Sequence, residues 1–197
     1  MMDLDKILSI RMATLMPEQG RLLISNPFLS DYFFRRSVVL LIDHGDDGSF
    51  GVIINKPMDF TVAEVTSSFP AARGKVYLGG PVKTDGLFYI HTLGNSIPES
   101  IQIMDGLWWG GKLEVLEEII SADPARALDS IRFYLGYSGW VSEQLGSEIK
   151  ARSWLITNAD PKEIMEEQVS DLWSQKVQSM GKPFDTWLRF PADPSFN

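Results

Sequence analysis

The sequence contains no cysteine. This absence excludes disulfide bonds, thiol nucleophiles and cysteine-ligated metal centres, and it makes a reducing compartment the natural setting. Histidine is almost as scarce: only His44 and His91 occur, so a metal site built from three histidines is impossible. We therefore predict a protein that needs no metal and no other cofactor.

Long hydrophobic runs are also missing. The longest uninterrupted aliphatic run is Val38–Ile42, whereas a helix needs about 20 apolar residues to cross a bilayer. The N-terminal residues include Asp3 and Asp5 and lack the apolar core of a secretory signal. These features predict a cytoplasmic protein that is not bound to a membrane.

Positive charge is in short supply. The chain has 18 Lys and Arg against 26 Asp and Glu, a formal net charge of −8. The excess lies in residues 99–197, which hold 9 basic and 16 acidic side chains, whereas residues 1–98 hold 9 and 10. Because an acidic protein repels phosphate backbones, we expect no direct binding to DNA.

Hydrophobic patterning predicts the fold class. The 197 residues show no internal repeat and no linker, which favours one domain over residues 1–197. Strands are predicted mainly in the first half, at 20–25, 37–44, 49–55, 75–79, 86–91 and 100–104, with a returning strand at 153–157. Helices are predicted at 4–16, 61–70, 112–121, 124–135, 140–149 and 161–180, with a turn of the chain at 136–139. Residues 1–18 form an N-terminal helical extension in this interpretation, and 183–197 form a loop-like tail. Grouped strands followed by grouped helices favour an α+β fold.

Several local signals support these boundaries. The sequence Asp46-Asp47-Gly48 between two apolar runs predicts a β-hairpin. Thr61 and Glu64 have the spacing of a capping box. Asp-Pro pairs at 123–124 and 160–161 each predict a helix start, with Asp as the cap and Pro in the first helical position.

Motifs that carry enzyme chemistry are absent. The chain has no phosphate-binding Walker loop and no dinucleotide fingerprint. Gly136–Trp140 resembles a nucleophile elbow but has Trp where the second Gly is required. Asp43–Gly48 lacks the ligand spacing of a calcium loop. We therefore favour a non-enzymatic binding or regulatory protein.

Adjacent tryptophans, Trp108 and Trp109, suggest a contact surface for a protein partner. Neighbouring side chains on a strand point to opposite faces, so both rings cannot enter one core. An exposed aromatic ring is a common anchor in protein interfaces, although a second core that covers both rings is the alternative.

A small-molecule or anion site is the second hypothesis. Its candidate residues lie at or next to the ends of predicted strands: Arg36, His44, Asn55, Lys56, Gly79, Gly80 and His91. Glycines in such a place allow backbone N–H groups to face a ligand. A hydrolase that uses His44 or His91 with Asp43 or Asp85 is a third, less favoured hypothesis.

The sequence resembles the AlgH/YqgE family of bacterial proteins from Gly20 to about Gly181. The matching segments are Gly20–Pro27, Phe34–Leu41, His44, Gly51–Pro57, Leu78–Val82, His91, Leu135–Trp140, Gln144–Leu145, Glu148 and Trp154–Leu155. The resemblance implies a bacterial cytoplasmic protein with an α+β fold whose sheet curls into a partial barrel, with helices packed against it. The family is labelled as transcriptional regulators without an established biochemical activity, so the resemblance assigns no catalytic residue.

Overall fold

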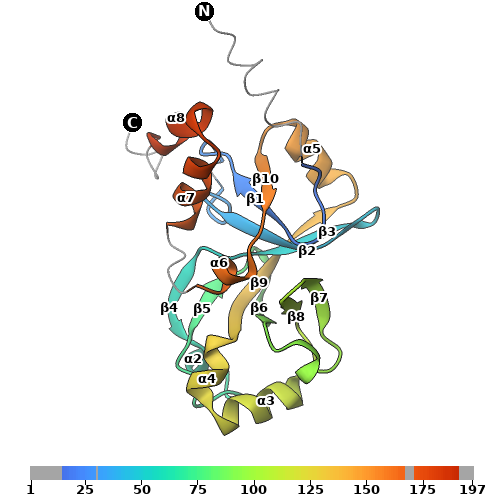
Figure 1. Cartoon of the computed structure of the whole chain (residues 1–197), viewed down its shortest axis with the longest axis vertical. Coiled ribbons are helices and arrows are strands. Elements are labelled where there is room, and N and C mark those ends of the chain that lie inside the picture. The colour runs from blue at the N-terminus through green and yellow to red at the C-terminus, as the bar shows by residue number, and fades with distance from the viewer. Residues whose placement is uncertain (1–14, 30, 167–170, 191–197) are drawn as a thin grey trace, which may run out of the picture.

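The computed structural model describes residues 15–29, 31–166 and 171–190. Its centre is a ten-stranded sheet with the order β10-β1-β2-β3-β9-β6-β8-β7, while β4 pairs with β5 and β5 with β9. The predicted α+β class is confirmed. The sheet is curved but is not closed into a barrel (Figure 1).

The strands are β1 (Arg21–Ser25), β2 (Val38–Gly45), β3 (Gly48–Ile53), β4 (Pro57–Thr61), β5 (Lys75–Leu78), β6 (Val82–His91), β7 (Ile101–Met104), β8 (Leu107–Trp109), β9 (Ile131–Val141) and β10 (Trp154–Asn158). The α-helices are α2 (Val62–Val65), α3 (Leu113–Ala122), α4 (Pro124–Asp129), α5 (Gln144–Lys150), α6 (Pro161–Met165), α7 (Leu172–Ser179) and α8 (Asp185–Leu188). Two 3₁₀ turns, Gly94–Ser96 and Lys182–Phe184, complete the described elements.

One half of the sheet consists of β10, β1, β2 and β3, with α5 on one side and α7 on the other (Figure 1). Strand β2 is buried on both faces, as its continuous apolar run predicts. Val39 and Leu41 join the core beside Leu145 of α5, while Leu40 and Ile42 join the core beside Trp173 of α7. Because successive side chains of a strand point to opposite faces of the sheet, the apolar run of β2 contributes to two separate cores.

The other half consists of β5, β6, β8, β7 and the first part of β9, with α2, α3 and α4 at its end (Figure 1). Its core includes Leu116 and Ile120 of α3, which pack with Phe133 of β9 and Phe69. The helix predicted at 112–121 is therefore confirmed as α3, which buries Leu116 and Ile120 on one side, while α4 buries Ala127.

Strand β9 joins the two halves. Its first part pairs with β6 and β5, and its last part pairs with β3. Gly136, at φ 68°, marks the change of partner. There the segment Gly79–Gly80 crosses so closely that a Cβ on Gly79 would lie 2.2 Å from the Gly136 carbonyl oxygen. Only glycine fits at such a distance.

A half-buried carboxylate anchors α5 to the sheet. Glu148 Oε2 accepts hydrogen bonds from the indole N–H groups of Trp140 in β9, at 2.9 Å, and of Trp154 in β10, at 2.7 Å. Phe34 packs against both indole rings. The Trp and Glu residues that carry the family resemblance in this region therefore connect α5 to two strands.

The predicted hairpin and helix caps are confirmed. Asp46 and Asp47 form the two-residue turn between β2 and β3. Thr61 and Glu64 form the capping box of α2. Asp123 and Asp160 accept backbone N–H groups at the starts of α4 and α6.

Other predictions from the C-terminal half are wrong. The helix expected over 124–135 ends at Asp129, and residues 136–139 lie inside β9 instead of turning the chain. Ile131–Val141 is rich in aromatic and β-branched residues, and pairing with three strands decides its conformation. The helix expected at 140–149 begins only at Gln144.

The helix expected over 161–180 is also wrong as a single element, because α6 ends at Met165 and α7 starts at Leu172. Residues 182–188 form a 3₁₀ turn and α8, so the predicted loop-like tail is partly helical. Most of the helix predicted at 4–16 lies outside the described residues, and residues 15–18 are not helical.

We predict that Gly79→Ala lowers the free energy of unfolding by about 3 kcal/mol, because overpacking against backbone cannot be relieved by a rotamer change. Gly146→Ala is the matched control, since a Cβ at this position would meet no atom outside its own helix within 4 Å and α5 favours alanine. That substitution is expected to raise stability by about 0.5–1 kcal/mol. Urea unfolding measures both, and equal stability of the two variants would contradict the close crossing.

Candidate functional site

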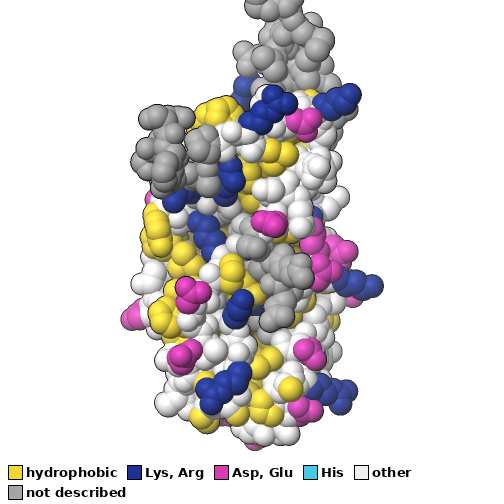
Figure 2. All heavy atoms as spheres, turned by 90° about the vertical axis from the view of Figure 1, so that its left-hand side faces the viewer, with side chains coloured by type: hydrophobic (Ala, Val, Ile, Leu, Met, Phe, Trp, Pro, Cys, Tyr) yellow, Lys and Arg dark blue, Asp and Glu magenta, His cyan; other side chains and the backbone are white. Residues whose placement is uncertain are grey.

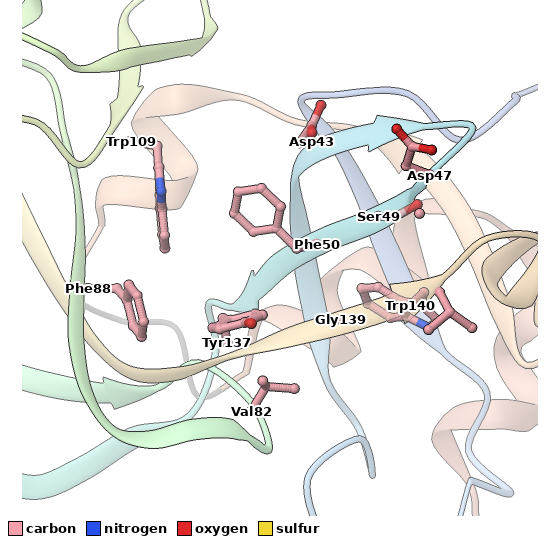
Figure 3. Close-up of a pocket in the computed structure, with 12 residues that line it drawn as sticks. Asp43, Asp47, Ser49, Phe50, Val82, Phe88, Trp109, Tyr137, Gly139 and Trp140 are labelled. Carbon is pink, nitrogen blue, oxygen red and sulfur yellow. The ribbon is translucent and has the colours of Figure 1, made fainter.

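A groove of about 660 Å³ lies where the two halves of the sheet meet (Figure 3). It draws residues from the β2–β3 hairpin, β6, β8 and the end of β9. The lining residues are Asp43, Asp47, Gly48, Ser49, Phe50, Val82, Phe88, Trp109, Tyr137, Gly139, Trp140 and Val141. Its size falls within the range of small-molecule pockets.

Four aromatic rings form a continuous apolar surface in this groove (Figure 3). Trp109 stacks on Phe88, with ring centroids 5.6 Å apart, and Phe88 meets Tyr137 edge-on at 5.5 Å. Phe50 closes the cycle with contacts of 5.7 Å to Trp109 and 6.1 Å to Tyr137. All four side chains are partly exposed and rest on the core beneath them. They are therefore held rigid and still present ring surface to a ligand.

The charge of the groove is negative. Asp43 and Asp47 line it from the β2–β3 hairpin, and its lining contains no Lys, Arg or His. Figure 3 shows both carboxylates beyond the Phe50 ring, along one side of the groove. Aromatic faces attract cations through their quadrupole. The rings and the carboxylates therefore both favour a positively charged ligand.

The two adjacent tryptophans have different surroundings. Trp109 lines the groove. Trp108 points to the opposite face of β8, where its ring stacks on that of His91 at 6.3 Å. Both indoles are partly exposed. The structure thus separates the predicted partner surface into one residue in the groove and one outside it.

His91 is fully buried, and both of its ring nitrogens have partners. Nε2 donates to the Gly110 carbonyl oxygen at 3.0 Å, and Nδ1 accepts the Leu93 backbone N–H at 3.2 Å. Nε2 also lies 2.9 Å from Ser100 Oγ. Burial lowers the pKa of His91, although the bond to Gly110 partly opposes this shift. The neutral imidazole therefore connects three loops.

His44 occupies a different place, at the far end of β2. Its Nδ1 lies 2.6 Å from Ser49 Oγ across the hairpin. The Asp43 carboxylate accepts the backbone N–H of His44 and not its ring. Asp85 lies on the exposed bulge of β6. In the described part of the chain, neither imidazole forms an ion pair with a carboxylate, so the Ser–His–Asp arrangement of a hydrolase is not assembled.

A second cavity, of about 620 Å³, brings together part of the predicted anion surface. Arg35, Arg36 and Lys56 line it, and Asp59 is the single acidic residue of the lining. Tyr32, Pro57, Met58, Phe60 and Leu78 supply the rest. Figure 2 shows the side of the molecule that carries β4 and α7, where hydrophobic side chains and Lys or Arg side chains are interspersed.

The other residues of the predicted anion surface do not line this cavity. Asn55 is buried, and its amide accepts the Val38 N–H at 2.8 Å and donates to the Arg36 carbonyl at 2.9 Å. Gly79 donates its N–H to the Leu135 carbonyl, so that group is not free for a ligand. Gly80 lies against Tyr137. These three residues shape the backbone around the crossing, and sequence alone did not separate this role from ligand binding.

The groove itself was found only in part from the sequence. The sequence singles out Trp109, whereas it predicts Phe50 and Phe88 as ordinary strand residues and Tyr137 as part of a turn. They are distant in sequence, and no periodicity shows that three strands bring them together. Among the described residues, no group of three His, Asp or Glu side chains is placed to hold a metal. No described helix is long and apolar enough to cross a membrane.

The fold and the groove together define an α+β protein with an open ten-stranded sheet and an acidic, aromatic groove on it. The AlgH-like family model matches residues 22–185, and the chain belongs to this family. A UPF0301 protein from Bacteroides thetaiotaomicron is 42% identical over 199 residues, which cover 100% of both chains. A UPF0301 protein from Parabacteroides distasonis is 38% identical over 200 residues, with the same coverage.

Two solved structures share the fold. The solution structure of the AlgH protein from Pseudomonas aeruginosa has a TM-score of 0.67 and 26% identity, over 88% of this chain and 94% of that one. A crystal structure of a protein from Corynebacterium diphtheriae has a TM-score of 0.73 and 22% identity, over 89% and 94% of the two chains. The family is of uncharacterised function, so the residues of this chain must support any proposal.

We predict that His91 makes the protein less stable as the pH falls below 6.5. The unfolded chain protonates His91 near pH 6.5, while the buried ring resists protonation until a lower pH. Stability from this group is therefore complete above pH 6.5 and is lost as the pH falls through the native pKa. In urea unfolding between pH 7.5 and 5, the free energy of unfolding should fall more steeply for wild type than for His91→Gln. The difference in slope is at most about 1.4 kcal/mol per pH unit. Parallel curves would contradict this assignment.

Proposed function

We propose that this protein is a non-enzymatic binding protein that holds a short segment of a partner protein in the aromatic groove. The observation that supports the proposal most is the cycle formed by Phe50, Trp109, Phe88 and Tyr137, which remains partly exposed in a groove of about 660 Å³. Rigid aromatic rings are frequent anchors in protein interfaces, because they bury large areas at a low cost in conformational entropy.

The chemistry of the groove selects the kind of segment. Its apolar rings favour a Leu- or Phe-like side chain, and its carboxylates, Asp43 and Asp47, favour Lys or Arg nearby. The net charge of −8 adds a long-range attraction for a basic partner. The proposed occupant is therefore an extended segment in which basic and apolar side chains alternate.

The proposal also agrees with the regulatory role that the family resemblance implies. The regulator would act in the cytoplasm through contact with another protein, because its charge opposes direct binding to DNA. The groove lies at strand surfaces and not on a basic recognition helix. A catalytic role is less favoured, since the Ser49–His44 pair has no carboxylate partner for its ring among the described residues.

We predict that Trp109→Ala weakens binding of a labelled peptide of alternating Lys and Leu by about tenfold or more, because truncation of an aromatic anchor costs about 2 kcal/mol or more. Trp108→Ala is the matched control, since Trp108 lies outside the groove on the other face of β8. Fluorescence anisotropy measures both affinities, with circular dichroism to verify folding. Equal affinities of the two variants would contradict the assignment of the groove.

The charged side of the groove provides a second test that leaves the rings intact. Asp43→Asn/Asp47→Asn is expected to weaken binding of the same peptide and to reduce the dependence of its affinity on salt. Glu114→Gln/Glu118→Gln, on exposed positions of α3, changes the net charge equally at a distance from the groove. If both double variants bind equally, only overall charge is involved and the proposed specificity is wrong.

A further inference from the structure

We propose that the cavity lined by Arg35, Arg36 and Lys56 binds a small organic phosphate, with the phosphate at the cations and an apolar or aromatic body against Met58, Phe60 and Leu78. This site shares no lining residue with the aromatic groove. It therefore does not depend on the proposed function and concerns a ligand of opposite charge.

The local charge supports an anionic ligand. Three cations and one carboxylate, Asp59, line the cavity, although the whole chain has a net charge of −8. Arginine presents a planar fork of donors that matches phosphate oxygens, and lysine adds a compact charge. At about 620 Å³ the cavity can hold a molecule of the size of a nucleotide.

Contacts within the protein hold Arg36 in place without a ligand. The Arg36 guanidinium lies over the Trp173 ring at 4.9 Å and donates to the Phe190 carbonyl oxygen. Its backbone is held at φ 49°, a conformation that is strained for arginine, by the hydrogen bonds of Asn55. Strained residues that the surroundings hold in place are frequent at ligand sites.

The Lys56 ammonium group keeps one N–H group that can donate a hydrogen bond to a ligand. Its ammonium group donates to the carbonyl oxygens of Tyr32, at 3.1 Å, and Phe33, at 2.5 Å. An ammonium has three N–H groups, so one remains without a partner among the described residues. These contacts place Lys56 at the loop that precedes Arg35 and Arg36.

The ionisation of Lys56 couples ligand binding to pH. Burial, together with the nearby charge of Arg35, lowers the pKa of Lys56 to about 8, and Asp31 opposes the change. A bound phosphate favours the charged ammonium and raises this pKa again. Binding therefore takes up a proton above pH 8, and the affinity decreases there by up to about tenfold per pH unit.

Calorimetric titration of the full chain with adenosine 5′-monophosphate tests the proposal, with inorganic phosphate and adenosine as partial ligands. The phosphate ester has its second pKa near 6, so its charge is constant between about pH 7.5 and 9.5. We expect the monophosphate to bind more tightly than either partial ligand. Its affinity should fall by about tenfold between about pH 8.5 and 9.5. Absence of binding at millimolar monophosphate, or affinity that does not change with pH, would overturn the proposal.

Variants of Lys56 separate the site from general charge effects. Lys56→Met should lower the affinity at about pH 7.5 by about tenfold or more, since it removes a charge-assisted hydrogen bond. Lys56→Arg should retain binding and lose the decrease above pH 8, because arginine stays charged. Lys150→Met, at an exposed position of α5, is the control and should bind as wild type does. Equal affinity of the two Met variants contradicts the site, and normal monophosphate binding by Trp109→Ala distinguishes it from the groove.

Discussion

The close backbone contact between Gly79–Gly80 and strand β9 determines how the two halves of the sheet meet. Gly79 donates its N–H to Leu135, and its carbonyl accepts the Ile53 N–H at 2.9 Å and the Ser138 hydroxyl at 3.1 Å. These bonds connect β3, the end of β5 and β9 at one point. A side chain on Gly79 would separate them. This constraint explains the glycines without reference to a ligand.

Both candidate sites depend on this crossing. Tyr137 follows Gly136, where β9 changes its pairing partner, and its ring lines the aromatic groove. Leu78 precedes the crossing and donates its N–H to the Lys56 carbonyl oxygen at 2.9 Å. This hydrogen bond connects the crossing to the cavity lined by Arg35, Arg36 and Lys56, which Leu78 also lines. The same short segment thus separates an acidic, aromatic groove from a basic cavity. The two proposals therefore concern ligands of opposite charge at two separate sites.

Local signals made part of the fold predictable. Three kinds of feature depend only on residues that are close in sequence: the Asp-Gly hairpin, the Thr61–Glu64 capping box and the Asp-Pro helix starts. Their side chains bond to neighbouring backbone groups or set the local backbone angles, so a short stretch of sequence is enough to predict them. Strand β9 could not be predicted in the same way, because Gly136 and its apolar spacing also fit a helix followed by a turn. Non-local pairing decides between the two. Most of the groove was missed for the same reason, since Phe50, Phe88 and Tyr137 converge only when three strands pair.

Native-state hydrogen exchange of the amides of Ile53 and Gly79 tests the role of the crossing most directly. If the crossing holds the sheet together, these amides exchange only through global unfolding, with an opening free energy equal to that from urea denaturation. The exposed turn at Asp46–Asp47 should open far more easily. Exchange of Ile53 and Gly79 through a smaller opening, while Leu23 and Leu40 in β1 and β2 remain protected, would contradict this role, because the two halves would then fold independently of the crossing.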